Sequence, residues 1–356
     1  MQKVPAIVIK DEIFLEHDPG FGHPESPNRL RAIYDRIAQD DLKDCYVEKR
    51  PRMATKEELS WNHSTGYIER IERTKGIAHY QLDPDTATSE RSWEAACFAV
   101  GGVFEALDAI FEGESSSAFA LVRPPGHHAE RDYAMGFCLF NNVALGAHYA
   151  IRKKGCKRVL IIDWDLHHGN GTQHSFYDRS DVLYFSTHQF PYYPGTGSLK
   201  EVGEGEGEGF TVNCPLSPGV GDEGYAAIFN HLLAPIIVEY DPDIILVSAG
   251  FDTYKDDPLG GMNVTEIGFA YMAKMLVELS EQCCDGRLLF TLEGGYNLNG
   301  LKEGVARVLM AINDSFPKNE RRIIENLKYA DNKSKELIEI INYHKKFWKN
   351  LVEQIE

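Results

Sequence analysis

The segment RVLIIDWDLHHGNG, residues 158–171, runs from an apolar, strand-like stretch directly into a cluster of acidic and histidine side chains. Three other segments repeat this design: AFALVRPPGHH (118–128), DIILVSAGFD (243–252) and RLLFTLEGGY (287–296). Parallel α/β sheets place their active sites outside the carboxyl ends of their strands. Four apolar segments that each end in metal-binding or proton-transferring residues therefore predict a single site at one edge of such a sheet.

Helical and strand-like patterns alternate along the rest of the chain. Two more strands are predicted at 6–14 and 181–188. Apolar residues recur at helical spacing in five other segments, namely 92–112, 141–153, 223–239, 264–282 and 300–314. This alternation predicts the α/β class, with a mostly parallel sheet and helices on both of its faces.

Length and composition indicate one large domain. The chain has 356 residues, of which 43% are hydrophobic and 26% are charged, as in ordinary globular proteins with a large core. Because α/β enzymes often exceed the usual domain size, a single domain over residues 1–356 is expected. The tail at 319–356 is polar and helix-forming, and it is predicted to be a helical extension packed on this domain, with Phe347 and Trp348 as anchors.

Charge, hydropathy and cysteine content exclude several classes of protein. A formal net charge of −17 argues against nonspecific binding to nucleic acid or to an anionic membrane, and it suits a cationic substrate weakly. No apolar run is long enough to span a bilayer, and no secretory signal is recognised. The seven cysteines are odd in number and include no CxxC pair, so reduced thiols and a cytoplasmic protein are expected.

The segment that follows the apolar residues 159–162 predicts a metal site. On an extended chain Asp163, Asp165 and His167 share one face, and three ionisable groups next to a buried strand are costly unless a cation compensates them. The alternative is a surface turn in which these side chains are hydrogen-bonded. Asp252 ends another apolar strand and offers a second oxygen ligand. A set of two carboxylates and one histidine leaves a position open for water, as in catalytic zinc sites, and it also suits Fe²⁺ or Mn²⁺.

Two further groups could move protons or stabilise charge. His127 and His128 follow a rigid Arg-Pro-Pro-Gly turn and become a candidate general base and its partner if a metal lies nearby. Asp163 and Asn170 are the nearest side chains available to orient them. Tyr296 follows two glycines, so its hydroxyl could reach the site and donate to an oxyanion. The alternatives are a surface histidine pair and a core tyrosine.

Taken together, RPPGHH, DWDLHHGNG, SAGFD and LEGGY resemble the zinc-dependent histone deacetylase family, in its class II-like branch with bacterial and archaeal histone deacetylase-like amidohydrolases. The resemblance extends from about His23-Pro24-Glu25 to Tyr296. It implies an arginase-like, three-layer α/β fold around a mostly parallel sheet of about eight strands. It also implies hydrolysis of the amide in acetyl-lysine or a related acylated amine.

The resemblance implies a role for each site residue. Zn²⁺, or Fe²⁺ in its place, would be held by Asp165, His167 and Asp252. His128 would be the general base and His127 its electrostatic partner. Tyr296 would supply the hydroxyl that polarises the substrate carbonyl. Asp163 would support His127, and Asn170 would orient His128.

The same resemblance implies a substrate tunnel. Gly136 and Phe137 match one wall, and Tyr193, next to Tyr192, is assigned to the opposite wall where the family usually has phenylalanine. Leu259 stands near the position of a glutamate gate in acetylpolyamine members, so it favours acyl-lysine or other uncharged-stem substrates. Either Asp83 or Asp85 would be a carboxylate at the rim.

A structural K⁺ is also implied. It would lie near Asp163 and Ser186 and share main-chain oxygens of Asp165, His167 and Thr187.

Other functions stay open beside the deacylase. An acetylpolyamine or other small acyl-amine hydrolase would use the same groups. A binuclear arginase-type hydrolase would need carboxylates where Gly169 and Tyr254 stand, and a non-catalytic binding protein should have lost one of the site residues. Homo-oligomerisation is left undecided.

Overall fold

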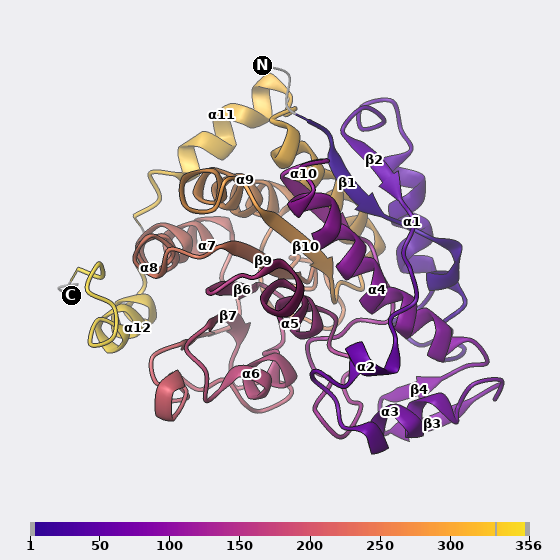
Figure 1. The fold of residues 1–356 in the computed structure, drawn as a ribbon. Coiled ribbons are helices and arrows are strands. Elements are labelled where there is room, and N and C mark those ends of the chain that lie inside the picture. Colours follow the sequence, from indigo (N-terminus) through magenta and orange to yellow (C-terminus); the bar gives the residue numbers. More distant parts are fainter. Residues whose placement is uncertain (1–3, 332, 353–356) are drawn as a thin grey trace.

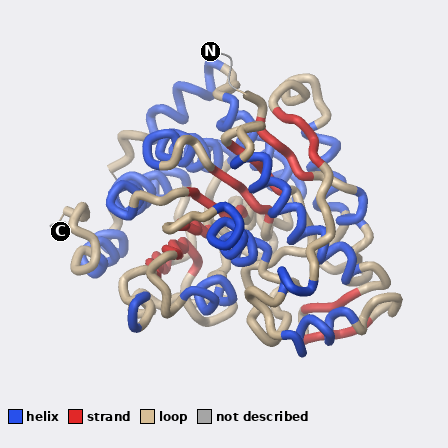
Figure 2. Tube along the Cα trace, in the orientation of Figure 1, coloured by secondary structure: helices blue, strands red, loops and turns tan. Residues whose placement is uncertain are grey.

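The centre of the molecule is an eight-stranded sheet in which all neighbouring strands are parallel (Figures 1 and 2). The computed structural model describes residues 4–331 and 333–352. The strand order β2-β1-β5-β10-β9-β6-β7-β8 confirms the predicted α/β fold. The strands are β1 (Ala6–Ile9), β2 (Tyr46–Lys49), β5 (Ser117–Ala120), β6 (Val159–Asp163), β7 (Val182–Gln189), β8 (Thr211–Leu216), β9 (Ile244–Ala249) and β10 (Leu288–Leu292).

Helices on both faces of this sheet complete a three-layer arrangement. On one face α4 and α5 pack together, and on the other α1, α9 and α10 do (Figure 1). The α-helices are α1 (Asn28–Ile37), α2 (Lys56–Leu59), α3 (Thr65–Glu72), α4 (Ser92–Phe111), α5 (Asn142–Lys154), α6 (Asn170–Phe176), α7 (Asp222–Ile228), α8 (Ala234–Tyr240), α9 (Glu266–Cys283), α10 (Leu298–Asn313), α11 (Lys318–Leu327) and α12 (Lys335–His344). Short 3₁₀ turns span Glu12–Leu15 and Gly205–Gly207, and a π-helical turn spans Phe229–Leu233.

The central strands are mostly apolar because helices cover both faces of the sheet. VLIID in β6, IILVSA in β9 and LLFTL in β10 are buried at every position. These are the strands whose carboxyl ends were predicted to carry the site. Their register keeps Asp163 at the end of β6 level with Ser248 of β9 and Ser186 of β7.

Two local predictions differ from the structure, and one feature was not predicted. The strand expected at 6–14 ends at Ile9, because the Asp11 side chain accepts a hydrogen bond from the main-chain N–H of Ile13 and begins a 3₁₀ helix. The single helix expected at 223–239 is divided into α7 and α8 by the π-helical turn. The antiparallel hairpin of β3 (Tyr80–Asp83) and β4 (Thr86–Thr88) was not expected.

The C-terminal segment packs on the rest of the molecule. α11 contacts α9 and α7, and α12 contacts the edge strand β8. Beyond α12, the indole of Trp348 is 5% exposed and lies 5.8 Å from the ring of Phe210 and 6.3 Å from that of Tyr240, measured between ring centroids. Residues 353–356 of the predicted extension lie outside the described residues.

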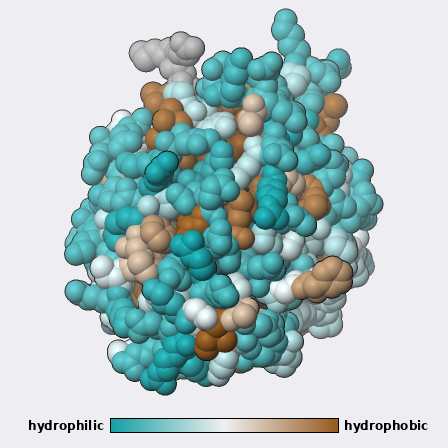
Figure 3. Space-filling model, turned by 90° about the vertical axis from the view of Figure 1, so that its right-hand side faces the viewer, coloured by the Kyte–Doolittle hydropathy of each residue, from teal (hydrophilic) through white to brown (hydrophobic). Residues whose placement is uncertain are grey.

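The surface is largely polar. On the face shown in Figure 3, apolar residues gather in small, separate patches between hydrophilic ones. Within residues 4–331 and 333–352, no helix combines the length and apolar character that a membrane span requires. All seven cysteines are unpaired, and six of them are buried.

Candidate active site

The predicted site residues meet at the carboxyl edge of the sheet. Strands β5, β10, β9 and β6 are consecutive neighbours, so the loops that follow them lie side by side. The loop after β5 carries the histidine pair, and the loop after β6 carries the DWDLHHGNG residues. The loops after β9 and β10 carry Asp252 and Tyr296.

Asp165, His167 and Asp252 form one cluster. Each offers one ligand atom, and these atoms lie within 4.8 Å of one another. His167 Nδ1 is 3.2 Å from Asp165 Oδ1 and 3.1 Å from Asp252 Oδ2. Main-chain amides of Leu166 and Gly294 donate to the two carboxylates, each over 2.8 Å, and so fix their orientation. This set of two oxygens and one nitrogen fits a divalent ion with an open coordination position.

The electrostatics of this cluster also favour a cation. Both carboxylates are fully buried. Burial and the neighbouring Asp165 raise the pKa of Asp252 to about 7. Burial lowers the pKa of His167, but hydrogen bonds to Asp165 and Asp252 outweigh it and raise this pKa to about 9. Two buried carboxylates at this distance are costly without positive charge, which a metal ion would supply.

Asp163 does not join the cluster, contrary to the expectation that Asp163, Asp165 and His167 converge. β6 ends at Asp163 and the following residues are no longer extended. Asp163 Oδ2 lies 3.0 Å from His127 Nδ1 and accepts a hydrogen bond of 3.1 Å from the Tyr184 hydroxyl. Burial lowers the pKa of His127, but Asp163 and Asp165 raise it to about 10. Asp163 and Asp165 thus favour the protonated form of His127.

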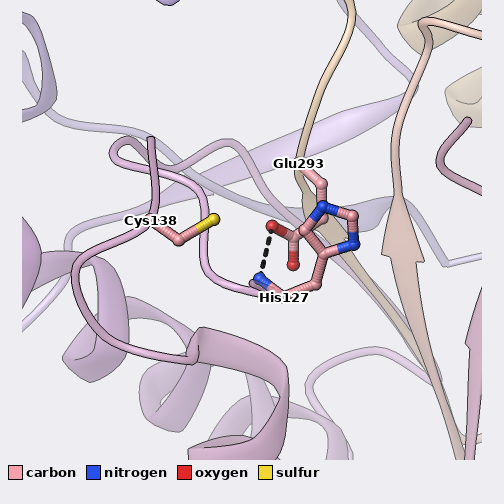
Figure 4. A group of neighbouring side chains, drawn as sticks. All are labelled: His127, Cys138 and Glu293. Atoms are coloured by element: carbon pink, nitrogen blue, oxygen red, sulfur yellow. Dashed lines mark hydrogen bonds between the residues drawn. The ribbon is translucent and has the colours of Figure 1, made fainter. Parts of the chain in front are cut away.

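A second group of ligand-type residues, His127, Cys138 and Glu293, lies next to this pair (Figure 4). Glu293 Oε2 accepts hydrogen bonds from the main-chain N–H groups of Gly126 (2.6 Å) and His127 (3.2 Å). The Cys138 thiol faces the carbonyl oxygen of Gly136, and burial raises its pKa well above the ordinary value. A neutral thiol and a hydrogen-bonded carboxylate indicate that this group holds the loop in place.

His128 is placed to take a proton. Its Nδ1 lies 2.8 Å from Asn170 Oδ1, and its ring borders a cavity together with His167. Burial, followed by the nearby His127 and His167, holds the pKa of His128 well below its usual range. The imidazole is therefore neutral, with Asn170 as its orienting partner.

The cavity beside these histidines has a volume of about 240 Å³. All four predicted tunnel residues line it, and Tyr192 does so as well; the complete lining is Asp85, His128, Gly136, Phe137, His167, Tyr192, Tyr193, Leu259 and Tyr296. The Tyr193 ring stands edge-on to His128, with 5.2 Å between the ring centroids. Asp85 lines the cavity, whereas Asp83 accepts a hydrogen bond of 2.9 Å from the Asp85 main-chain N–H.

Tyr296 faces the same cavity. Its main-chain N–H donates to Asp257 Oδ2 over 2.7 Å, and the guanidinium of Arg29 lies 5.1 Å from the centre of its ring. Burial raises the pKa of the phenol well above its usual value. The hydroxyl therefore stays protonated and can act as a hydrogen-bond donor.

The residues expected around K⁺ lie in neighbouring strands. Ser186 is paired in register with Asp163, and both Ser186 and Thr187 are fully buried. Ser186 Oγ is 2.9 Å from His188 Nδ1. Among the residues that the structure describes, Thr187 Oγ1 has no hydrogen-bond partner. The register thus brings Ser186 level with Asp163, as the expected K⁺ site requires, and this site stays a prediction.

Gly169 and Tyr254 occupy the two positions at which a second metal ion would require carboxylates. A side chain at Gly169 would lie 2.3 Å from Asp163 Oδ2. Tyr254 is buried, and its ring packs closely on Gly300. A Cβ added at Gly300 would lie 2.3 Å from Cδ1 of the Tyr254 ring. Within the described part of the chain, the ligand-type residues beside Asp252 form only the one group of three.

Sequence reasoning missed a buried charge network behind the site. Arg123 forms an ion pair with Glu25, and Arg29 Nη1 lies 3.0 Å from the same carboxylate. Arg29 Nε also donates to the main-chain oxygen of Gly295 over 2.7 Å, so the network supports the Tyr296 loop. The available signal was His23-Pro24-Glu25 at the start of the family resemblance. Arg29 follows Glu25 by four residues, but Arg123 lies 98 residues from Glu25 and Gly295 lies 266 residues from Arg29.

Comparison with known proteins agrees with this geometry. A family model, "Histone deacetylase domain", matches residues 23–312. Histone deacetylase 15 of Arabidopsis thaliana is 40% identical over 334 residues, which cover 92% of this chain and 59% of that protein. A probable deacetylase of Archaeoglobus fulgidus is 39% identical over 302 residues, which cover 83% of this chain and 82% of that protein.

A solved structure shows the same fold over nearly the whole chain. The crystal structure of the HDA15 HD domain aligns with a TM-score of 0.88 at 38% identity, covering 98% of this chain and 97% of that one. The matched region is less than two thirds of the full Arabidopsis protein but most of the archaeal one. The family model covers well over half of the sequence, and this chain belongs to the histone deacetylase family.

Proposed function

We propose that this protein is a zinc-dependent amidohydrolase that removes an acetyl or other acyl group from acyl-lysine or a related acylated amine. The observation that carries the proposal is the cluster of Asp165, His167 and Asp252, whose ligand atoms lie within 4.8 Å of one another beside a cavity that His128 and Tyr296 also line. Zinc held by these three residues would act as a Lewis acid and lower the pKa of a bound water.

The side chains around the cavity supply the rest of the chemistry. His128, kept neutral and oriented by Asn170, accepts a proton as water adds to the acyl carbonyl, and later gives it to the leaving amine. Tyr296 donates a hydrogen bond to the carbonyl oxygen as negative charge develops on it. Asp163 favours the protonated form of His127, which would add positive charge to the site. The C–N bond breaks and leaves a carboxylate and a free amine.

The cavity walls favour an extended, uncharged stem. Phe137 and Tyr193 are aromatic, and Leu259 adds an apolar side chain, so a methylene chain would be enclosed and shielded from water. Asp85 lies at the same cavity and offers a carboxylate to main-chain amides or to an amine of the substrate.

The metal assignment is tested by metal content, which does not depend on turnover. Protein loaded with Zn²⁺ or Fe²⁺ is expected to bind one ion per chain, measured by elemental analysis after desalting. Asp252→Asn should lose this ion, because a negatively charged carboxylate ligand is replaced by a neutral amide. Asp256→Asn, in the same loop but exposed, is the matched control and should keep it. Retention of the full metal content by Asp252→Asn would refute the assignment.

The activity is tested with a panel of fluorogenic acyl-lysine peptides, acylated small amines and acetylpolyamines. Turnover of acyl-lysine and its loss on chelation are expected. A preference for acetylpolyamines would instead favour a polyamine deacetylase. The negative net charge of the chain, which suits a cationic substrate, supports this alternative. His128→Ala and Tyr296→Phe should each reduce kcat by about 10²–10³. No turnover of any member by metal-loaded protein would favour a non-catalytic binding protein.

A cytoplasmic localisation and a structural K⁺ belong to the same proposal. Seven unpaired cysteines support a reducing compartment. The buried pair of Asp163 and Ser186, level with each other in neighbouring strands, supports the K⁺ site.

A further inference from the structure

Glu130 lies behind the His128–Asn170 pair and contacts the Asn170 amide. Its side chain is largely buried, and its Oε1 accepts a hydrogen bond of 2.6 Å from Asn170 Nδ2. Two other acceptors face the same amide nitrogen, the main-chain oxygen of His128 at 3.3 Å and Met135 Sδ at 3.4 Å. A charged acceptor at short distance makes the strongest of these hydrogen bonds. All three contacts require the same orientation of the amide, and Glu130 contributes most to it.

This orientation determines where the proton on His128 lies. A carboxylate oxygen only accepts hydrogen bonds, so the group that Asn170 presents to Glu130 is its NH₂. The Asn170 carbonyl oxygen then faces His128 Nδ1 over 2.8 Å and needs a donor there. Nδ1 therefore carries the proton, and Nε2 of the neutral ring keeps its lone pair.

We propose that Glu130 is a positioning residue that sets, through Asn170, the Nδ1-protonated tautomer of His128. Glu130 touches neither the 240 Å³ cavity nor the metal cluster, so it acts only through its neighbours. A general base must present an unprotonated nitrogen to the water it activates, and the opposite tautomer would present an N–H group. The kinetic consequence rests on the proposed function, whereas the tautomer does not.

Glu130 is itself held on both sides. His63 Nε2 accepts a hydrogen bond of 3.0 Å from the main-chain N–H of Asn141, so His63 Nδ1 carries the proton and donates to the Glu130 carbonyl oxygen over 2.9 Å. The side chain of His174 approaches the same Oε1 to 2.7 Å. The His63 contact thus fixes the main chain of Glu130, as a positioning role requires, and His174 is only a second partner of its carboxylate.

Two variants of similar size separate this role from simple packing. Glu130→Gln keeps an acceptor oxygen for Asn170, whereas Glu130→Met fills the space with a weak acceptor only. The ¹⁵N NMR signals of His128, assigned by their loss in His128→Ala, report its tautomer in metal-free protein. Wild type and Glu130→Gln should show a protonated Nδ1, and Glu130→Met should show a mixture of tautomers. Thermal melting checks that each variant is folded, and Glu130→Ala replaces the methionine variant if that one is not.

Kinetics on the metal-loaded protein give the second readout. Glu130→Met should lower kcat by about 10–100-fold, the usual cost of losing an outer-shell partner, and leave KM unchanged. Glu130→Gln should stay close to wild type. His174→Gln is the matched control, because it removes the other partner of Glu130 without touching Asn170. The inference is overturned if wild-type His128 carries its proton on Nε2, or if Glu130→Met keeps both the tautomer and kcat. Absence of wild-type activity would count against the proposed function alone.

Discussion

At the scale of single residues, Gly136 shows how closely the site is packed. Its backbone has a left-handed φ of 55°, and a Cβ at this position would lie 2.3 Å from Cδ2 of the His128 ring. Gly136→Ala should therefore displace the imidazole and lower kcat by about 10²-fold, as a misplacement of about 1 Å commonly does. Steady-state kinetics on acyl-lysine substrates measures this effect.

Gly76→Ala is the control for backbone strain. Gly76 has a φ of 75°, but no atom lies within 4 Å of the position of its Cβ. This variant should lose stability, by about 1 kcal/mol, without loss of kcat. If both alanine variants keep full activity, the contact between Gly136 and His128 does not constrain the base.

The same scale shows what local sequence can and cannot reveal. Asp165, His167 and Asp252 were predicted to meet because each follows an apolar strand, and neighbouring parallel strands end at the same edge. Glu130 and Arg29 carry no such pattern. Glu130 lies two residues after His128, but its partner Asn170 is 40 residues away, and Gly295, the partner of Arg29, is 266 residues away. Only the folded chain makes these contacts.

At the scale of secondary-structure elements, the C-terminal segment is proposed to belong to the single domain. Trp348 packs against Phe210 and Tyr240, next to the region where α12 contacts the edge strand β8. Trp348→Ala should lower the free energy of unfolding of the whole protein by about 3–5 kcal/mol. Denaturant unfolding measures this free energy, and a single domain should show one cooperative transition. Tyr329→Ala is the control, since this ring is 81% exposed and its loss should have little effect. An unchanged main transition in Trp348→Ala would mean that the segment is an independent appendage.

Secondary-structure elements were easiest to predict where the apolar residues follow one regular pattern. Continuous apolar runs gave β6, β9 and β10, and helical spacing gave α4 and α9 within two residues at each end. The strand expected at 6–14 was wrong beyond Ile9, because a polar cap at Asp11 overrides the apolar residues that follow it.

At the scale of the whole molecule, buried neutral histidines make stability depend on pH. Burial is the largest cause that lowers the pKa of His63 to about 4, of His148 to about 3 and of His344 to about 4. In the unfolded chain these side chains titrate near 6.5. Between these values the unfolded state binds more protons than the folded state, so stability falls as the pH falls from about 6.5 toward 4.

His148 allows this dependence to be tested at one site. Its ring packs beside Phe176, with 5.2 Å between the ring centroids, and it lies outside the proposed catalytic groups. His148→Gln cannot gain a proton on unfolding, so its free energy of unfolding should fall less steeply with pH, by up to about 1.4 kcal/mol per pH unit between pH 6 and 4. Urea unfolding of both proteins across this range measures the two slopes. Carboxylates protonate equally in both proteins and cancel in the difference. Parallel slopes would mean that His148 is protonated in the folded protein, and that its burial does not exclude charge.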